Sequence, residues 1–235
     1  MSQSVNRPVW VDLSSHDPAG SRAFYRALLG WVVEPSPDPQ FGGYAVATLD
    51  GKDVAGIGGV QSPGQPTAWS VYLGTTDAAA TAARVTAAGG TVVAPPFPVG
   101  PMGSMAVFRD PTGAFISAWQ AGVMSGFTAE GPGSFGWAEL NTRDLERSVA
   151  FYTTAFGWGT RRNDMPIGPY VEFLDGEDSV GGCMGMMPTV PPEVPDYWTV
   201  YFRTADIDAS VATATDLGAQ LLVPPTPFPA AGSRS

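Results

Sequence analysis

One passage of this sequence is written twice, and the repeat restricts the available folds more than any other feature. WVDLSSHDPAGSRAFYRALLGW begins at Trp10, and WAELNTRDLERSVAFYTTAFGW begins at Trp137, 127 residues later. The copies are identical at nine of 22 positions without a gap, and the segments that begin at Tyr44 and Tyr170 also correspond. A duplication on this scale predicts two equivalent domains.

We place these domains at residues 7–121 and 135–235, with a glycine-rich linker at residues 122–134. Each domain is itself divided, because a strand, a helix and further strands begin at Trp10 and again at Trp69. The sequence therefore predicts an α+β fold of tandem βαβββ modules. These modules would form two curved, half-open barrel-like sheets with helices on their outer faces.

The repeated passage runs from a strand into a helix. In the first strand, alternation places Val9, Val11 and Leu13 on one face and Trp10 and Asp12 on the other. Asp17 and Asp144 are suited to cap the two helices, and Gly30 and Gly157 to end them. The residues expected to pack against the sheets are Ala23, Phe24, Ala27 and Leu28 in the first helix, and Phe151, Tyr152, Ala155 and Phe156 in the second.

Charge and cysteine content exclude several classes of protein. The net charge is −10, and the 12 basic residues are scattered, so we expect no nucleic-acid partner and no membrane partner. Cys183 is the only cysteine, so no disulfide can form within the chain, and we interpret it as a buried apolar residue. The N-terminal residues lack the pattern of a signal peptide, which favours a cytoplasmic location.

The repeated W-x-[DE]-L-x-[ST]-x-D passages, together with DPTGAFISAWQ from Asp110, carry a family resemblance. They resemble the vicinal-oxygen-chelate superfamily, which includes glyoxalase I, bleomycin-resistance proteins and extradiol dioxygenases. The resemblance covers nearly the whole chain. More narrowly, the chain is similar to two-domain actinobacterial members that are labelled hydroxylases. Because this superfamily hosts several chemistries as well as binding proteins, the resemblance implies the fold more specifically than the function.

Metal-dependent members of the superfamily hold a divalent ion on three strands, through His or Gln, His, and Glu. The corresponding positions here are Trp10, Ser70 and Ser117 in the first domain, and Trp137 and Thr199 in the second. An indole cannot bind a metal ion in this way, and hydroxyl groups bind poorly at neutral pH. We therefore expect no bound metal and no organic cofactor. The single histidine, His16, is expected to be a solvated residue of the turn before the first helix.

The same alternation predicts what lines each hollow instead. A tryptophan, a carboxylate and a tyrosine recur in both domains, and aromatic walls with one acid suit a flat apolar ligand. The predicted catalytic residues are Asp12, Tyr72, Glu139 and Tyr201. The predicted ligand-binding residues are Trp10, Ser70, Ser117, Trp137 and Thr199. The alternative interpretation is that these side chains fill the core and satisfy one another.

Three functions remain open from the sequence. The leading one is a metal-free protein that binds, and as an enzyme would transform, a small hydrophobic or aromatic metabolite. The second is a resistance protein that sequesters a drug without turnover, and the third is a metal-dependent glyoxalase-like lyase or dioxygenase. A homodimer is an open alternative to a monomer.

The two domains differ at their ends. PPFPVGPMGS in the first domain continues into MAVFRDPTGAFISAWQ, whereas PPTPFPAAGS in the second is followed only by Arg234 and Ser235. The sequence thus predicts that the last module of the second domain lacks its final two strands and leaves an open sheet edge. We therefore favour the first domain as the working site, and we expect the proline-rich stretches to form rigid loops.

Overall fold

A computed structural model describes residues 5–165 and 168–226. The first half contains β1 (Pro8–Ser15), α1 (Pro18–Leu29), β2 (Val32–Pro35), a short 3-10 helix (Pro39–Phe41), β3 (Ala45–Leu49) and β4 (Lys52–Gly59), then β5 (Ala68–Gly74), α2 (Ala78–Ala87), β6 (Thr91–Pro98), β7 (Gly103–Arg109) and β8 (Phe115–Ala121). The second half contains β9 (Phe135–Thr142), α3 (Leu145–Phe156), β10 (Gly159–Met165), β11 (Gly168–Asp175), β12 (Asp178–Gly185), β13 (Tyr197–Phe202) and α4 (Ile207–Asp216).

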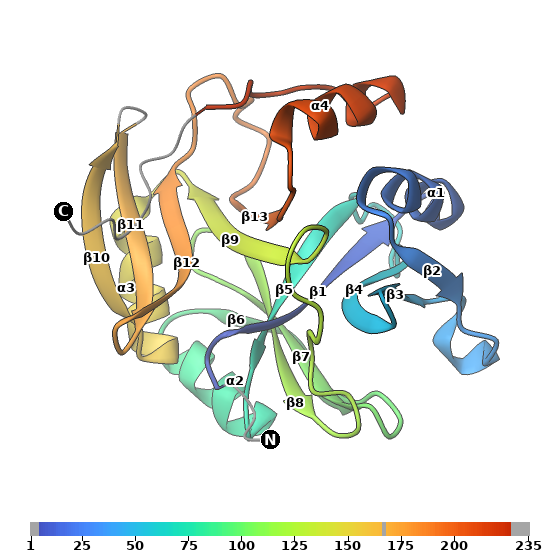
Figure 1. Ribbon diagram of the computed structural model, residues 1–235. Coiled ribbons are helices and arrows are strands. Elements are labelled where there is room, and N and C mark those ends of the chain that lie inside the picture. The colour runs from blue at the N-terminus through green and yellow to red at the C-terminus, as the bar shows by residue number, and fades with distance from the viewer. Residues whose placement is uncertain (1–4, 166–167, 227–235) are drawn as a thin grey trace.

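The strands form two mixed sheets that stay open (Figure 1). Their orders are β2-β3-β4-β1-β5-β8-β7-β6 and β10-β11-β12-β9-β13. In each sheet the first strand lies between a parallel and an antiparallel neighbour, which are β4 and β5 for β1, and β12 and β13 for β9. This arrangement confirms the predicted α+β fold of tandem βαβββ modules. None of the helices in the described part of the chain is long and apolar enough to cross a membrane.

The helix ends form as the sequence predicts. The Asp17 carboxylate accepts a hydrogen bond from the backbone N–H of Gly20, and Asp144 does the same for Arg147. Gly30 and Gly157 end α1 and α3 with φ of 72° and 73°, the left-handed conformation that glycine adopts without strain. Because these signals are local, the same sequence pattern produces the same helix twice.

One hydrophobic core joins the two halves. It contains Val11 and Leu13 from β1, Val85 from α2, and Phe151 and Tyr152 from α3. α2 packs against α3, and α1 lies beside α4 (Figure 1). The face of β1 that carries Val11 and Leu13 is therefore the helix side of the first sheet, and Trp10 and Asp12 lie on the opposite face.

The predicted packing face is correct for α3 and wrong for α1. Phe151, Tyr152, Ala155 and Phe156 are all buried, as expected. In α1, however, Ala23 and Ala27 are exposed, and Tyr25 and Leu29 make the contacts with the core. The two helices differ because both α2 and the β7–β8 turn pack against α3, whereas α1 contacts α4 and has no turn like β7–β8 against it among the described residues.

Two other expectations are corrected. Val9 lies in the same cluster as Trp10, because the pairing of β1 with β5 shifts register between Pro8 and Trp10. Residues 95–98, predicted as a loop, form the irregular end of β6. The second proline-rich stretch and the predicted truncation fall partly on residues 227–235, outside the described residues.

Candidate functional site

The first predicted site forms a hydrogen-bonded set of four side chains, which we call the first tetrad: Trp10, Asp12, Tyr44 and Tyr72. The Tyr72 hydroxyl donates to Asp12 Oδ2 at 2.8 Å. The Trp10 indole N–H donates to the Tyr44 hydroxyl at 3.0 Å, and Tyr44 also hydrogen-bonds the Asp12 carboxylate. The structure thus brings together the predicted trio and one residue that we did not predict.

Glycines in β4 make room for the Tyr44 ring. A Cβ at Gly56 would lie 1.8 Å from the Tyr44 hydroxyl oxygen, and one at Gly58 would lie 3.0 Å from its Cδ2. Gly56 also lies opposite Asp12 in the β1–β4 pairing. The glycines therefore allow Tyr44 to lie across the strand and reach both Trp10 and Asp12.

The surroundings of Asp12 change its acidity. Burial raises its pKa from 3.8 to about 6, although hydrogen bonds from Tyr72 and Tyr44 act in the opposite direction. Burial, followed by the charge of Asp12, raises the pKa of both phenols well above 10, so they remain protonated donors. A carboxylate with a pKa near neutrality, held by two fixed donors, can accept a proton from a bound ligand.

The second half repeats this arrangement as the second tetrad: Trp137, Glu139, Tyr170 and Tyr201. Tyr201 donates to Glu139 Oε1 at 3.0 Å, and the Trp137 indole N–H donates to the Tyr170 hydroxyl at 3.0 Å. Gly182 takes the role of Gly56, since its Cβ would lie 1.9 Å from the Tyr170 hydroxyl oxygen. Burial raises the pKa of Glu139.

The three predicted hydroxyl residues lie beside the tetrads. Ser70 is opposite Asp12 in the β1–β5 pairing, and Ser117 is opposite Tyr72 in the β5–β8 pairing. Thr199 is opposite Glu139 and accepts a hydrogen bond from Asn141 Nδ2 at 3.0 Å. These residues therefore share the face of the sheet that carries each tetrad.

The two tetrads differ in how they are covered. Tyr72 is 6% exposed, whereas Tyr201 is 46% exposed. Side chains from β7 itself, from the segment before it and from the segment after β8 pack against Trp10, Tyr72 and Trp119: Val99, Met102, Met105, Met124 and Phe127. The Phe127 ring lies 5.8 Å from the Trp10 ring. The first tetrad is thus enclosed by flexible, largely apolar side chains, and the second is open at Tyr201.

Metal ligands do not gather at either tetrad. Among the described residues, no group of three or more His, Cys, Asp or Glu side chains could hold a metal ion. Trp10 uses its only polar atom to donate to Tyr44, so it has nothing to offer a cation. The side chains at the positions that the family resemblance assigns to metal ligands therefore form a donor set that does not fit a metal ion.

The sequence contained a signal for the residue that we missed. Tyr44 and Tyr170 begin corresponding segments, and glycines follow in the next strand of each segment. That Tyr44 would reach Trp10 depends on the register between β3 and β4, where Val46 lies opposite Gly56. Register between neighbouring strands could not be determined from alternation alone.

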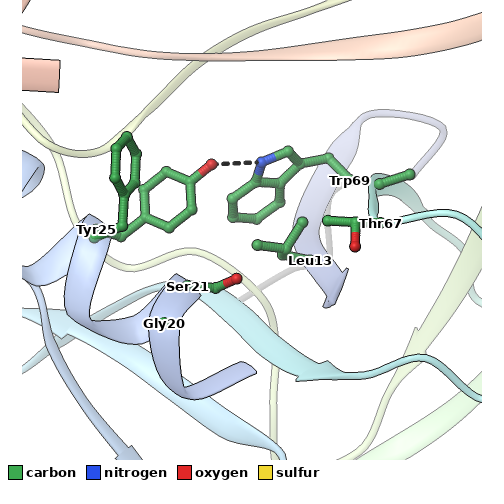
Figure 2. Close-up of a pocket in the computed structure, with 8 residues that line it drawn as sticks. Leu13, Gly20, Ser21, Tyr25, Thr67 and Trp69 are labelled. Carbon is green, nitrogen blue, oxygen red and sulfur yellow. Dashed lines mark hydrogen bonds between the residues drawn. The ribbon is translucent and has the colours of Figure 1, made fainter. Parts of the chain in front are cut away.

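A groove of about 410 Å³ lies on the other face of the first sheet, beside α1 (Figure 2). Its lining includes Leu13, Ser21, Phe24, Tyr25 and Trp69. The Trp69 indole N–H donates to the Tyr25 hydroxyl at 3.1 Å. The groove is separate from the first tetrad, because Leu13 and Asp12 point to opposite faces of β1.

The fold and the paired tetrads define a duplicated βαβββ protein of the glyoxalase type. Residues 9–117 match the family described as Glyoxalase-like domain, and residues 134–235 match the Glyoxalase/Bleomycin resistance protein/Dioxygenase superfamily. The chain belongs to this superfamily, which confirms the resemblance to vicinal-oxygen-chelate proteins.

Two kinds of relative have informative names. The chain is 36% identical over 231 residues to "Putative glyoxylase CFP32" of Mycobacterium tuberculosis, covering 96% of this chain and 87% of that protein. It is also 36% identical over 240 residues to "Anthracycline biosynthesis protein DauV" of a Streptomyces species, covering 94% of this chain and 86% of that protein.

Solved structures share the fold at low sequence identity. A 2,2',3-trihydroxybiphenyl 1,2-dioxygenase from Sphingomonas wittichii is 18% identical with a TM-score of 0.64, covering 92% of this chain and 80% of that one. A Mn(II)-bound glyoxalase from Novosphingobium aromaticivorans is 14% identical with a TM-score of 0.61, covering 92% of this chain and 70% of that one.

Proposed function

We propose that the first tetrad binds a small aromatic metabolite without a metal ion and accepts a proton or hydrogen bond from it. Asp12 is the acceptor, Tyr72 and Tyr44 fix its carboxylate, and Trp10 forms the wall against which the ligand stacks. The observation that supports this proposal most directly is that at both sites an indole lies beside a carboxylate that two tyrosines hydrogen-bond, Tyr72 and Tyr44 for Asp12 and Tyr201 and Tyr170 for Glu139.

The cover over the first tetrad is compatible with a ligand that enters by displacing it. Met102, Met105 and Met124 are unbranched and adaptable, and they meet the tetrad through apolar contacts. A flat ring could replace these contacts while the ligand's polar group reaches Asp12. Enclosure of this kind excludes water and strengthens the interaction of Asp12 with that group.

The ligand class follows from the chemistry of the site and the names of two relatives. A carboxylate with a pKa of about 6 is mostly ionised at neutral pH, so it can accept a hydrogen bond from a phenolic hydroxyl of a ligand. The related proteins DauV and DnrV are named for anthracycline biosynthesis. Anthracyclines contain a flat anthraquinone ring system with hydroxyl groups. We therefore propose a planar, hydroxylated aromatic metabolite as the ligand.

A titration with 1,8-dihydroxyanthraquinone tests this proposal. Quenching of tryptophan fluorescence should report binding, and Asp12→Asn should weaken it about tenfold or more, because a hydrogen bond to a charged group is lost. Glu139→Gln is the matched control in the second tetrad and should leave the affinity nearly unchanged. Equal losses in both variants, or no binding at all, would contradict the proposal.

The same mixture distinguishes an enzyme from a sequestering protein. Mass spectrometry of the ligand after incubation should reveal a new product if the site has catalytic activity. Stoichiometric capture of unchanged ligand would instead support the drug-sequestering alternative. The net negative charge of the chain would favour binding of a cationic drug.

A further inference from the structure

The linker between the two halves is hydrogen-bonded to the strands that carry the first tetrad. The backbone N–H of Phe127 donates to the Val9 carbonyl of β1 at 2.9 Å. Thr128 donates its N–H to the Asp53 carbonyl at 3.0 Å, and its hydroxyl accepts from the Asp53 N–H at 2.7 Å. At Gly126, with φ of 121°, the chain passes so close to β1 that a Cβ would lie 2.2 Å from the Val9 carbonyl oxygen. The backbone of this segment is therefore fixed to the first half.

The Phe127 side chain contacts two other aromatic rings. The centroids of the Phe127 and Trp10 rings are 5.8 Å apart, with 33° between the ring planes. Phe127 also stacks on Phe135, the first residue of β9, at 4.7 Å and 12°. Because aromatic rings in contact have centroids about 4.5–7 Å apart, a planar ligand that stacks on this side of Trp10 has to take the place of Phe127.

A second cavity, which we call the linker cavity, begins at the same phenylalanine. Its volume is about 260 Å³, and it is lined by Phe127, Thr128, Ala129, Glu130, Phe135 and Arg203. Within the described part of the chain, Phe127 is the lining residue that also belongs to the cluster around Trp10 and Tyr72. Small-molecule sites usually have volumes of about 300–1,000 Å³, so the linker cavity is small for a complete site. Its position suits an entrance.

Building on the proposed function, we propose that Phe127 is the gate of the first tetrad and that the linker cavity is its entrance. Because the backbone N–H of Phe127 is held by Val9, the gate opens when the ring rotates about its Cα–Cβ bond, while the linker backbone stays in place. A planar, hydroxylated aromatic ligand then occupies the vacated face of Trp10 and reaches Asp12. Phe127 thus competes with the ligand, and it limits both the rate of entry and the affinity.

Stopped-flow mixing with 1,8-dihydroxyanthraquinone tests the gate. Phe127→Ala should increase the association rate and the affinity about fivefold or more, because the ligand no longer replaces an aromatic contact. Phe24→Ala is the matched control, since Phe24 is also partly exposed but contacts Tyr25 and lines the α1 groove. It should change neither quantity. If Phe127→Ala does not unfold cooperatively, Phe127→Leu takes its place and should act in the same direction. An unchanged association rate would overturn the proposal.

A substitution in the linker cavity tests the entrance. Glu130 is exposed and lines the cavity, so Glu130→Phe should narrow the entrance and keep the fold intact. Association and dissociation should both slow by the same factor, about threefold or more, and the affinity should stay the same, because the bound state is unaltered. Glu177→Phe, at an exposed turn between β11 and β12, is the control and should change neither rate. Unchanged rates in Glu130→Phe would mean that the ligand enters elsewhere, contrary to the proposal.

Hydrogen exchange distinguishes rotation of the ring from detachment of the linker. The amides of Phe127 and Thr128 donate to Val9 and Asp53, so their exchange reports whether the linker backbone stays in place. Under the proposal, saturating ligand leaves the protection of both amides unchanged. Loss of that protection would mean that the whole segment detaches, which contradicts a gate formed by one side chain.

Asp12→Asn separates failure of the gate from failure of the proposed function. Binding that depends on Asp12, with rates that do not respond to Phe127→Ala, would overturn the gate and leave the proposed function in place. Binding that ignores Asp12→Asn, or the absence of binding in both the original chain and Phe127→Ala, would overturn both. The proposal expects binding that weakens in Asp12→Asn and accelerates in Phe127→Ala.

Discussion

Gly56 lies directly against the hydroxyl of Tyr44, so close that a Cβ at Gly56 would stand 1.8 Å from the hydroxyl oxygen. Because the two residues lie so close, the Tyr44 hydroxyl can accept a hydrogen bond from the Trp10 indole while it also hydrogen-bonds the Asp12 carboxylate. The same relationship recurs between Gly182 and Tyr170. The absence of a side chain at Gly56 in β4 thus determines where the phenol of Tyr44, the residue before β3, lies.

Gly56→Ala should therefore destabilise the protein by about 1–3 kcal/mol, because the added methyl group displaces Tyr44 from a filled site. Gly185→Ala is the matched control in a strand, since a Cβ there meets nothing within 4 Å. Urea unfolding of both variants measures the difference. Equal stabilities would show that Tyr44 does not need the space at Gly56.

The raised pKa of Asp12 predicts a specific pH dependence of stability. Between about pH 4 and pH 6 the folded state holds a proton on Asp12 that the unfolded state has released. The contribution of Asp12 to the free energy of unfolding is therefore largest at low pH. It falls as the pH rises through that window, by no more than about 3 kcal/mol.

Asp12→Asn removes this ionisation. The stability of the original protein relative to the variant should fall as the pH rises from 4 to 7, and denaturant unfolding at several pH values measures that difference. A constant difference across the window would mean that Asp12 titrates as an ordinary surface carboxylate.

Asp110 should be among the most sensitive positions at the contact between the two halves. It is 4% exposed and accepts hydrogen bonds from Tyr152 and from backbone N–H groups of its own turn. Asp110→Ala leaves these buried donors unpaired and should cost about 3 kcal/mol of unfolding free energy. Asp77→Ala, which removes an exposed helix cap, should cost about 1 kcal/mol. Similar losses in the two variants would contradict this ranking.

Metal content is a separate prediction. Trp10, Ser70 and Ser117 occupy the positions that the family resemblance assigns to metal ligands, and this donor set does not fit a metal ion. Elemental analysis of the purified protein should find well below one transition-metal ion per chain, and chelator treatment should leave its melting temperature unchanged. Near-stoichiometric metal would instead favour the lyase or dioxygenase alternative.

Local signals in the sequence predicted most of the fold. Asp17 and Gly30 delimit α1 through contacts with their own neighbours in the chain, so a single sequence was enough to place the helix. Alternation along β1 likewise put Trp10 and Asp12 on one face, which brought them together with Tyr72.

Non-local contacts account for what the sequence did not reveal. Tyr44 joins the first tetrad because of the β3–β4 register, and a one-residue shift would have turned it away. The exposure of Ala23 and Ala27 depends on what covers α1, which its own sequence does not specify. Val9 joined the other cluster because of a bulge beside Pro8 that alternation cannot predict.

The indole N–H signals in a ¹H–¹⁵N correlation spectrum test the proposed ligand site most directly. The chain contains seven tryptophans, and single replacements by phenylalanine assign each signal. Adding 1,8-dihydroxyanthraquinone should shift the Trp10 signal, because the ligand stacks on that indole, and leave the Trp69 signal in place. A shift at Trp69 with none at Trp10 would place the ligand in the α1 groove and contradict the proposed site.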